Sequence, residues 1–184
     1  MDTFQLKGMG VALVTPFKSD KTIDFEALSN IIEYVISGKA DFIVVLGTTG
    51  ETPVLFPEEK EEIRRFVVDR VAGRLPLVLG VGGNNTRAVC NELETLNLEN
   101  YRAILSVVPF YNKPSQEGLF QHYREVAKAS PLPVILYNVP GRTGVNMTAA
   151  TTLRIASEID NVIGVKEASG NFIQIEEIIK NKPD

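Results

Sequence analysis

Six short runs of Val, Ile and Leu recur along the chain at a nearly even spacing, and this repeat constrains the fold more than any other feature. Successive runs start 26 to 35 residues apart, beginning near Val11, Phe42, Leu77, Ala103, Pro133 and Val162. Such a period accommodates a strand, a loop and a helix in each repeat. Each run is almost continuously apolar rather than alternating, which is typical of parallel strands covered on both faces.

The segments between these runs carry helix start and stop signals. Asp24 precedes a helical pattern over 25–36 with Gly38 just beyond it, and Pro57 opens an acidic first turn whose pattern ends before Gly73. These are the residues that cap and terminate helices. The next four helices are predicted to open at Thr86, Ser115, Thr148 and Ser169. No Pro/Ser-rich linker interrupts the repeat, which predicts one continuous domain.

Two architectures fit repeated βα units: an open doubly wound sheet and a closed (β/α)8 barrel. No run is followed by G-x-G-x-x-G, and Gly80–Gly83 lacks the third glycine spacing and the acidic residue of a dinucleotide site. Unusual polar residues instead follow the runs, at Thr15, Thr48, Thr49, Asn84, Tyr111, Tyr137 and Lys166. In a barrel these strand ends converge on one mouth. We therefore expect a (β/α)8 TIM barrel, truncated here to about six βα units.

Composition narrows the class of protein. The 184 residues are 44% hydrophobic with a net charge of -4, which fits a globular chain with one sizeable core. No apolar run approaches the roughly 18 to 20 residues of a membrane-spanning helix, and residues 1–7 lack the regions of a signal peptide. We therefore expect a cytoplasmic protein. The absence of Lys/Arg blocks argues against nucleic acid as a partner.

The scarcity of cysteine and histidine excludes several kinds of site. Cys90 alone cannot form an internal disulfide or a multi-cysteine metal site, and its helical context indicates a packing residue. His122, the only histidine, lies in a helical pattern where a structural or surface role is expected rather than catalysis. Histidine-based metal sites and Ser-His-Asp triads are thus poorly supported. Tyr, Thr, Lys and carboxylate side chains remain for proton transfer.

Lys166 ends the apolar run 161–167 and is the strongest candidate for chemistry. We expect this run to be a buried strand. Apolar surroundings disfavour an ammonium and lower a lysine pKa, which leaves a neutral amine able to attack a carbonyl and form a Schiff base. The alternative is a strand-end lysine that simply reaches for water. The other polar strand ends favour the chemical interpretation, because a barrel would bring them to the same mouth.

Five separated motifs carry a family resemblance. They are Gly10–Phe17 (GVALVTPF), Gly47–Glu51 (GTTGE), Val108–Pro114 (VPFYNKP), Tyr137–Gly144 (YNVPGRTG) and Gly164–Ser169 (GVKEAS). In order and spacing the chain resembles the dihydrodipicolinate synthase and N-acetylneuraminate lyase family over all 184 residues. The resemblance implies a class I aldolase-type barrel in which pyruvate attached to a lysine adds its enamine carbon to an aldehyde. It implies neither a metal nor an organic cofactor.

Family members continue with two more βα units and C-terminal helices. Residues 1–184 are therefore expected to form the N-terminal part of a single barrel. The chain is then either part of a longer protein or a fragment whose chemistry is impaired. An open arc of strands would leave unpaired edges and exposed apolar residues, so an isolated fragment should associate or aggregate.

The turn Gly47–Gly50 also has a physical interpretation. Its backbone N–H groups can converge on a carboxylate, and the hydroxyls of Thr48 and Thr49 add further donors. An ordinary βα turn would show the same residue types. By resemblance, Gly47, Thr48 and Thr49 hold the carboxylate of pyruvate.

The resemblance also assigns a proton relay. It makes Lys166 the carrier of pyruvate and Tyr137 the proton donor and acceptor of the Schiff-base steps, linked through Thr48 to Tyr111. Tyr137 ends an apolar run, where it could simply bury its ring with the hydroxyl at the rim. The loop of Tyr111 reaches the partner subunit's site in family members, which implies a homodimer or a homotetramer built from two dimers.

Arg142 is the candidate for choosing the aldehyde. Its guanidinium fork suits a carboxylate, although an arginine after a Pro-Gly turn can also be merely exposed. In the sialic acid lyases of the family, the position of Arg142 is apolar and the first turn commonly reads Gly-Ser-Thr-Gly-Glu. By resemblance, Arg142 and Thr48 therefore favour condensation of pyruvate with L-aspartate 4-semialdehyde to 4-hydroxy-tetrahydrodipicolinate, a step of lysine and diaminopimelate biosynthesis. The alternatives are another pyruvate-dependent lyase of the family, acting on 2-keto-3-deoxy sugar acids or sialic acid, and a catalytically silent binding or assembly module.

Feedback by lysine is expected to be weak or absent. Some family members bind lysine through a histidine, an acidic residue and a tyrosine at a dimer interface. The matching positions here are Lys60, Ala88 and Phe110. A cation at position 60 would repel the ammonium of the ligand, and Ala88 offers it no carboxylate.

Overall fold

The computed structural model describes residues 6–183, which form two compact units. The first unit comprises the described residues up to Gly80 together with Glu99–Arg102. The second comprises Val81–Leu98 and the described residues from Ala103 onward. Each unit is built from parallel strands that alternate with helices, as the repeat predicts.

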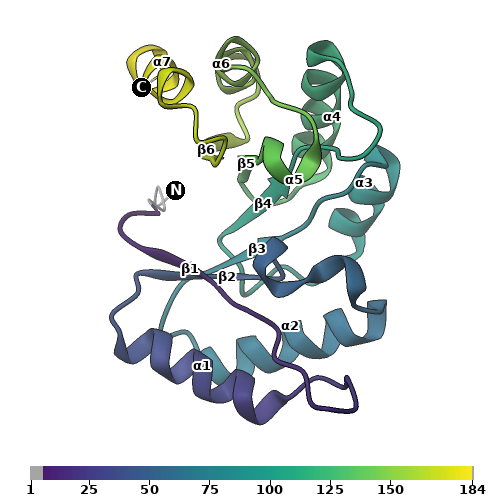
Figure 1. The fold of residues 1–184 in the computed structure, drawn as a ribbon, viewed down its shortest axis with the longest axis vertical. Helices are drawn as coiled ribbons and strands as arrows, with labels where there is room; N and C mark the ends of the chain where they lie inside the picture. Colours follow the sequence, from purple (N-terminus) through teal and green to yellow (C-terminus); the bar gives the residue numbers. More distant parts are fainter. Residues whose placement is uncertain (1–5, 184) are drawn as a thin grey trace. The chain divides into compact units, whose positions relative to one another are not determined.

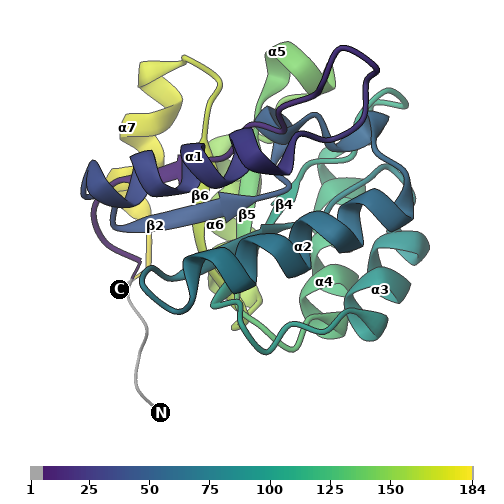
Figure 2. The ribbon, with the colours of Figure 1, turned by 90° about the horizontal axis from the view of Figure 1, so that it is seen from below.

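The first unit contains three parallel strands in sequence order. Its elements are β1 (Gly10–Ala12), α1 (Phe25–Ser37), β2 (Phe42–Val45), the 3-10 turns η1 (Thr48–Gly50) and η2 (Thr52–Val54), α2 (Pro57–Val71) and β3 (Leu77–Gly80). β2 pairs with β1 on one side and with β3 on the other. The helices α1 and α2 lie side by side (Figure 2). Apolar faces of both helices and of β2 are buried, which gives this unit its core.

The second unit contains three more parallel strands, with β5 between β4 and β6. Its elements are α3 (Thr86–Thr95), β4 (Ala103–Val107), α4 (Gln116–Ala129), β5 (Val134–Asn138), α5 (Pro140–Thr143), α6 (Ala149–Glu158), β6 (Val162–Glu167) and α7 (Phe172–Asn181). The helices follow one another in space as α3, α4, α6 and α7 (Figure 1). Buried side chains of α4, β5 and α6 form the core of this unit.

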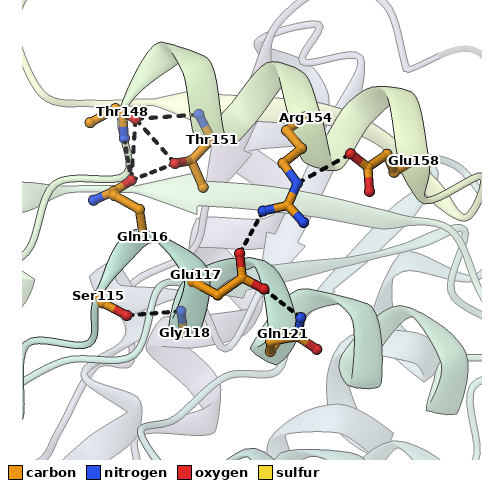
Figure 3. A network of polar contacts seen from close by, with 9 residues as sticks. All are labelled: Ser115, Gln116, Glu117, Gly118, Gln121, Thr148, Thr151, Arg154 and Glu158. Atoms are coloured by element: carbon orange, nitrogen blue, oxygen red, sulfur yellow. Dashed lines mark hydrogen bonds and ion pairs between the residues drawn. The ribbon is translucent and has the colours of Figure 1, made fainter.

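A polar contact layer joins α4 to α6 (Figure 3). The Oε1 atom of Gln116 accepts hydrogen bonds from the Oγ1 atom of Thr151 at 2.6 Å and from the backbone N–H of Thr148 at 3.1 Å. Further along the two helices, Arg154 pairs with Glu117 at 2.6 Å and with Glu158 at 3.1 Å. The N-terminus of α6 is thereby tied to α4, which fixes the loop between β5 and α6.

Most predicted helix starts are confirmed, and one is wrong. Asp24, Ser115 and Thr148 each accept a hydrogen bond from the backbone of their helix, and α3 begins at Thr86, with Asn85 as its cap. However, α7 is capped by Asn171 rather than Ser169. An asparagine lies close to the predicted residue there, and its side-chain oxygen caps as well as a hydroxyl does.

The expectation that 161–167 is a buried strand is wrong for most of β6. Only Val162 is buried there, whereas Ile163 is 48% exposed and Lys166 is exposed. Within the described residues β6 pairs with β5 alone, so its outer edge and much of its surface lack the cover that a continuously apolar run predicts.

His122 and Cys90 have the structural environments expected of them. His122 is 3% exposed in α4, and its Nδ1 atom lies 2.8 Å from the hydroxyl of Thr86. Burial lowers the pKa of His122 to about 4, so the ring is neutral at pH 7. Cys90 is half-buried in α3, and burial raises the pKa of its thiol.

Residues 6–183 contain neither a candidate membrane span nor a candidate metal cluster. No helix there is long and apolar enough to cross a membrane. The same residues include no cluster of three or more His, Cys, Asp or Glu side chains placed to hold a metal ion.

Candidate active site

Lys166 and Tyr137 face each other at the ends of neighbouring strands. The pairing of β5 with β6 sets Tyr137 opposite Lys166, and paired residues of parallel strands project from the same face of a sheet. The Nζ atom of Lys166 lies 4.5 Å from the centroid of the Tyr137 ring. Tyr137 is 7% exposed, so its buried ring forms a wall beside the more exposed side chain of Lys166. The structure thus brings together two of the residues that the sequence selects.

The surroundings of Lys166 favour its neutral form. Although the side chain is exposed overall, the protein atoms around it displace enough water to lower the pKa of its ammonium. The attraction of a cation to the face of the Tyr137 ring opposes this shift. The outcome is a larger fraction of nucleophilic amine near neutral pH than an ordinary surface lysine has.

The loop after β5 carries Arg142 and is held by a buried threonine. Residues 140–143 form the short helix α5, in which Arg142 is exposed. Thr143 is buried, and its hydroxyl donates to the carbonyls of Val139 at 3.2 Å and Val145 at 2.9 Å. The sequence predicts a loop here but not the helical turn, whose only signals are Pro140 at its first position and Gly144 after its last.

Tyr111 is linked to this loop through its backbone rather than its side chain. Its N–H donates to the carbonyl of Thr143 at 3.3 Å, while its ring is 84% exposed. The backbone φ of Tyr111 is 73°, in the left-handed region that residues with a Cβ seldom adopt. Neither packing nor backbone preference therefore explains a tyrosine at this position. Thr48 belongs to the first unit, so the predicted relay from Tyr137 through Thr48 to Tyr111 stays a prediction.

The turn Gly47–Gly50 is a single 3-10 turn in the first unit, as its sequence predicts. The hydroxyl of Thr52 donates to the carbonyls of Leu46 at 2.8 Å and Gly47 at 3.0 Å. The hydroxyl of buried Thr15 donates to the carbonyl of Gly50 at 2.7 Å. Both ends of the turn are therefore fixed by threonine side chains, and the sequence suggested such a position for Thr15 only as a polar strand end.

Within this turn, Thr48 is partly exposed and Thr49 is exposed. Gly50 is buried, and a Cβ there would lie 3.3 Å from the carbonyl oxygen of Leu13. The close approach of two backbones explains the glycine, and it leaves the threonine hydroxyls of the turn accessible to a ligand.

Sequence reasoning missed a second layer of polar residues behind Lys166 and Tyr137. Glu167 and Asn138 are the next residues of the two strands and are paired with each other. Asn138 is fully buried, and its amide lies 2.9 Å from the Glu167 carboxylate. The available signal was the alternation of a strand, which places each residue after a candidate on the opposite face.

Comparisons of sequence identify the family. The model of the dihydrodipicolinate synthetase family matches residues 5–184. The 4-hydroxy-tetrahydrodipicolinate synthase of Parabacteroides distasonis is 63% identical over 183 residues, covering 100% of this chain and 62% of the relative. The protein of the same name from Phocaeicola vulgatus is 56% identical over 179 residues, covering 97% of this chain and 60% of that relative.

Solved structures confirm the fold class. Dihydrodipicolinate synthase from Aquifex aeolicus matches with a TM-score of 0.90 and 41% identity, over 97% of this chain and 61% of that chain. The enzyme from Bacillus anthracis matches with a TM-score of 0.92 and 41% identity, over 99% of this chain and 62% of that chain. The fold is that of six βα units of a (β/α)8 barrel, and the chain spans 60 to 62% of the length of the two curated relatives. The chain belongs to the dihydrodipicolinate synthetase family.

Proposed function

We propose that this chain is the N-terminal part of a 4-hydroxy-tetrahydrodipicolinate synthase, a lyase that joins pyruvate to L-aspartate 4-semialdehyde through a lysine Schiff base. The observation that carries the proposal is the pair Lys166 and Tyr137. The Nζ atom of Lys166 lies 4.5 Å from the centroid of the Tyr137 ring, and burial lowers the pKa of this amine. Relatives that bear this enzyme's name at up to 63% identity support the choice of reaction.

The chemistry begins at the Nζ atom of Lys166. The neutral amine adds to C2 of pyruvate, and the resulting carbinolamine loses its hydroxyl as water after receiving a proton from Tyr137. Loss of a proton from C3 of the imine gives an enamine, whose C3 attacks the aldehyde carbon of the second substrate. The amine of that substrate then attacks C2, closes the ring and releases Lys166.

Two carboxylates must be held during this sequence. The turn of Gly47, Thr48 and Thr49 supplies backbone and hydroxyl donors for the carboxylate of pyruvate. Arg142 supplies a guanidinium for the carboxylate of the aldehyde substrate. Tyr111 and Thr48 complete the route by which the proton of Tyr137 is exchanged with solvent. No metal or organic cofactor takes part.

The rest of the proposal concerns the whole protein. The barrel is completed by two further βα units and C-terminal helices, and the exposed ring of Tyr111 serves the site of a partner subunit in a homodimer or a homotetramer. The enzyme acts in the cytoplasm, in lysine and diaminopimelate biosynthesis. The length of the curated relatives, of which this chain covers 60 to 62%, supports this completion.

Borohydride trapping tests the proposal directly. The 184-residue chain, and a chimera in which the C-terminal part of the Parabacteroides distasonis relative follows Asp184, are each incubated with pyruvate and borohydride. Peptide mass spectrometry should locate a reduced pyruvate adduct on Lys166. Lys166→Arg should abolish it, while Lys128→Arg, at an exposed position of α4, should leave it unchanged. An adduct in the chimera alone would assign the missing competence to the C-terminal part. No adduct in either protein would overturn the Schiff-base mechanism.

Substitution at Arg142 tests the aldehyde. In the active protein, Arg142→Ala should reduce turnover of aspartate semialdehyde by about 10²-fold or more while the trapped pyruvate adduct still forms, since a charge-assisted contact is lost. Arg142→Lys retains charge but not the fork and should fall between the two. Equal turnover of a neutral sugar aldehyde by the unsubstituted protein and Arg142→Ala, with no turnover of aspartate semialdehyde by either, would assign a sugar acid lyase instead.

A further inference from the structure

A closed polar cluster lies behind the reactive pair in the second unit. Its side chains come from β5, the loop before α6, β6 and α7, and they are Asn138, Asn146, Glu167 and Gln174. Asn138 and Gln174 are buried, and the other two are partly buried. A buried hydrogen-bonded cluster of this kind is costly to disturb, because each unsatisfied member loses its hydration without a replacement.

Two backbone N–H groups fix the direction of every hydrogen bond in the cluster. The N–H of Met147 donates to the Oδ1 atom of Asn138 at 3.0 Å, so the Nδ2 atom of Asn138 must be the donor toward its other neighbours. These neighbours include the Oδ1 atom of Asn146 at 2.8 Å and the carboxylate of Glu167 at 2.9 Å. The N–H of Ser169 also donates to Glu167, at 2.8 Å. The assignment of the amides therefore follows from donors that cannot be reversed.

The donors and acceptors of the remaining contacts follow from this assignment. The Nδ2 atom of Asn146 donates to the Oε1 atom of Gln174 at 2.9 Å, which leaves the Nε2 atom of Gln174 to donate to Glu167 at 3.0 Å. Position 167 thus meets three donors, from Asn138, Gln174 and the backbone of Ser169. Only a side chain that accepts with both oxygens satisfies all three, and a carboxylate is that side chain.

Apart from this cluster, β6 is held by its ladder with β5, by Val162 and Val165 against the core, and by Asn161 before the strand, but its ladder is irregular. The pairing runs from Val134 opposite Val162 to Ile135 opposite Gly164, so Ile163 is an extra residue on β6. Val162 is the only residue of the strand that is buried, and Val165 is partly buried against the same core. A slip of one residue would turn Lys166 to the opposite face, and a strand with one buried side chain and a register irregularity resists such a slip weakly.

We propose that Glu167 is a positioning residue: through Asn138, Gln174 and the backbone of Ser169 it locks β6 against β5 in the register that faces Lys166 toward Tyr137. The proposal rests on the proposed function for its catalytic consequence, while its structural claim stands on the cluster alone. The Ala168 N–H, which donates to the carbonyl of Asn138 at 2.8 Å, extends the same lock by one residue.

The test compares Glu167→Gln with three other variants of the protein that forms the pyruvate adduct. Glu167→Gln keeps nearly the same shape, but one carboxylate oxygen becomes an NH2 group. That group then faces side chains or backbone that also donate. The double variant Glu167→Gln with Gln174→Glu restores the bond between the two positions with donor and acceptor exchanged. Gln174→Met removes one donor more mildly, and Glu177→Gln changes an exposed glutamate of α7 as the matched control.

Three measurements read out the effect. The rate of borohydride-trapped adduct at saturating pyruvate should fall about 10- to 100-fold in Glu167→Gln, because the amine is displaced, with the half-saturating pyruvate concentration little changed. The pH midpoint of trapping should rise as water reaches Lys166. Backbone hydrogen exchange should accelerate in 164–168. Gln174→Met should show smaller changes of the same kind, the double variant should recover several-fold, and Glu177→Gln should match the unsubstituted protein.

The outcomes separate this inference from the proposed function. Unchanged trapping rate, pH midpoint and exchange in Glu167→Gln would overturn it, as would slower trapping without faster exchange in 164–168. If Glu167→Gln does not fold, the same comparison is made with Gln174→Met, and an unchanged pH midpoint and exchange there would overturn it. If the unsubstituted protein forms no adduct, the proposed function fails. The structural claim is then tested by comparing backbone hydrogen exchange in 164–168 between the 184-residue chain and its Glu167→Gln variant.

Discussion

The neighbouring strands β5 and β6 each present one reactive residue, yet they are held in place by different forces. β5 is paired on both sides and buried along most of its length, with the carbonyl of Tyr137 accepting a hydrogen bond from Val108 at 3.0 Å. β6 is paired on one side within the described residues and is mostly exposed. Tyr137 is therefore positioned by apolar packing, whereas Lys166 depends on directional polar contacts.

This difference fits the tasks proposed for the two residues. A tyrosine that hands over protons works from a fixed position, which dense packing provides. A lysine that forms a covalent adduct must swing toward substrate, and a strand end held mainly by hydrogen bonds leaves its side chain free. The contrast suggests which substitutions damage chemistry alone and which damage the fold.

The largest effect is expected from removing the hydroxyl of Tyr137 while its ring is kept. Tyr137→Phe keeps the ring beside Lys166 and the packing of β5, so the free energy of unfolding should change by less than about 1 kcal/mol. Loss of the proton donor should slow pyruvate trapping by about 10²- to 10⁴-fold. Trapping reactions quenched at successive times measure the rate, and chemical denaturation measures the free energy of unfolding. Tyr34→Phe, at an exposed tyrosine, is the control. Trapping at an undiminished rate would remove Tyr137 from the mechanism.

A core truncation tests the packing side of the comparison. Leu136→Ala in β5 removes a fully buried side chain and should lower the free energy of unfolding by about 2 to 5 kcal/mol. Ile163→Ala in β6 removes a side chain that is largely solvated and should cost less than about 1 kcal/mol. Urea denaturation of the two variants measures the difference. Equal losses would contradict the assignment of β5 to packing and β6 to polar contacts.

Acid stability provides a smaller and more specific contrast, because His122 lies on the helix α4 that packs behind β4 and β5. The folded-state pKa of about 4 lies below the unfolded value near 6.5, so the unfolded chain binds the proton more readily. The stabilisation by neutral His122 is complete above about pH 6.5 and declines toward pH 4. It amounts to as much as about 3 kcal/mol.

The measurement is the free energy of unfolding between pH 7 and pH 4. His122→Asn keeps a polar atom beside Thr86, which lies 2.8 Å from Nδ1 of His122, and it should show a shallower loss over this range. Carboxylates titrate in both proteins and cancel in the difference between the two curves. Parallel curves would mean that the pKa of His122 does not differ between the folded and the unfolded protein.

The sequence predicted the elements that follow from local chemistry. The runs that became β2 to β5 are almost continuously apolar, and Asp24, Ser115 and Thr148 cap α1, α4 and α6. The juxtaposition of Tyr137 and Lys166 also followed, because parallel strands end at the same edge. These features depend on a few neighbouring residues or on the common geometry of βα units.

Features set by tertiary contacts were not predictable from local patterns. The composition of 161–167 predicts a buried strand, and only the comparison with a complete barrel led us to expect exposed residues at the edge of the arc. The partners of Glu167 come from positions up to 29 residues away, and nothing in the strand pattern indicates that Asn138 and Gln174 converge on it. A charged residue in a strand reads as solvent-exposed until its donors are known.

The extra residue at Ile163 has a consequence for how this strand tolerates change in length. The lock proposed at Glu167 lies on the same side of this irregularity as Lys166. Under that proposal, the residues before Ile163 do not set the face from which Lys166 projects. Deleting Ile163 would convert an irregular ladder into a regular one while the amine keeps its face. The irregularity at Ile163 thus allows the connection between α6 and β6 to change length by one residue. Lys166 would then still project from the same face of the sheet.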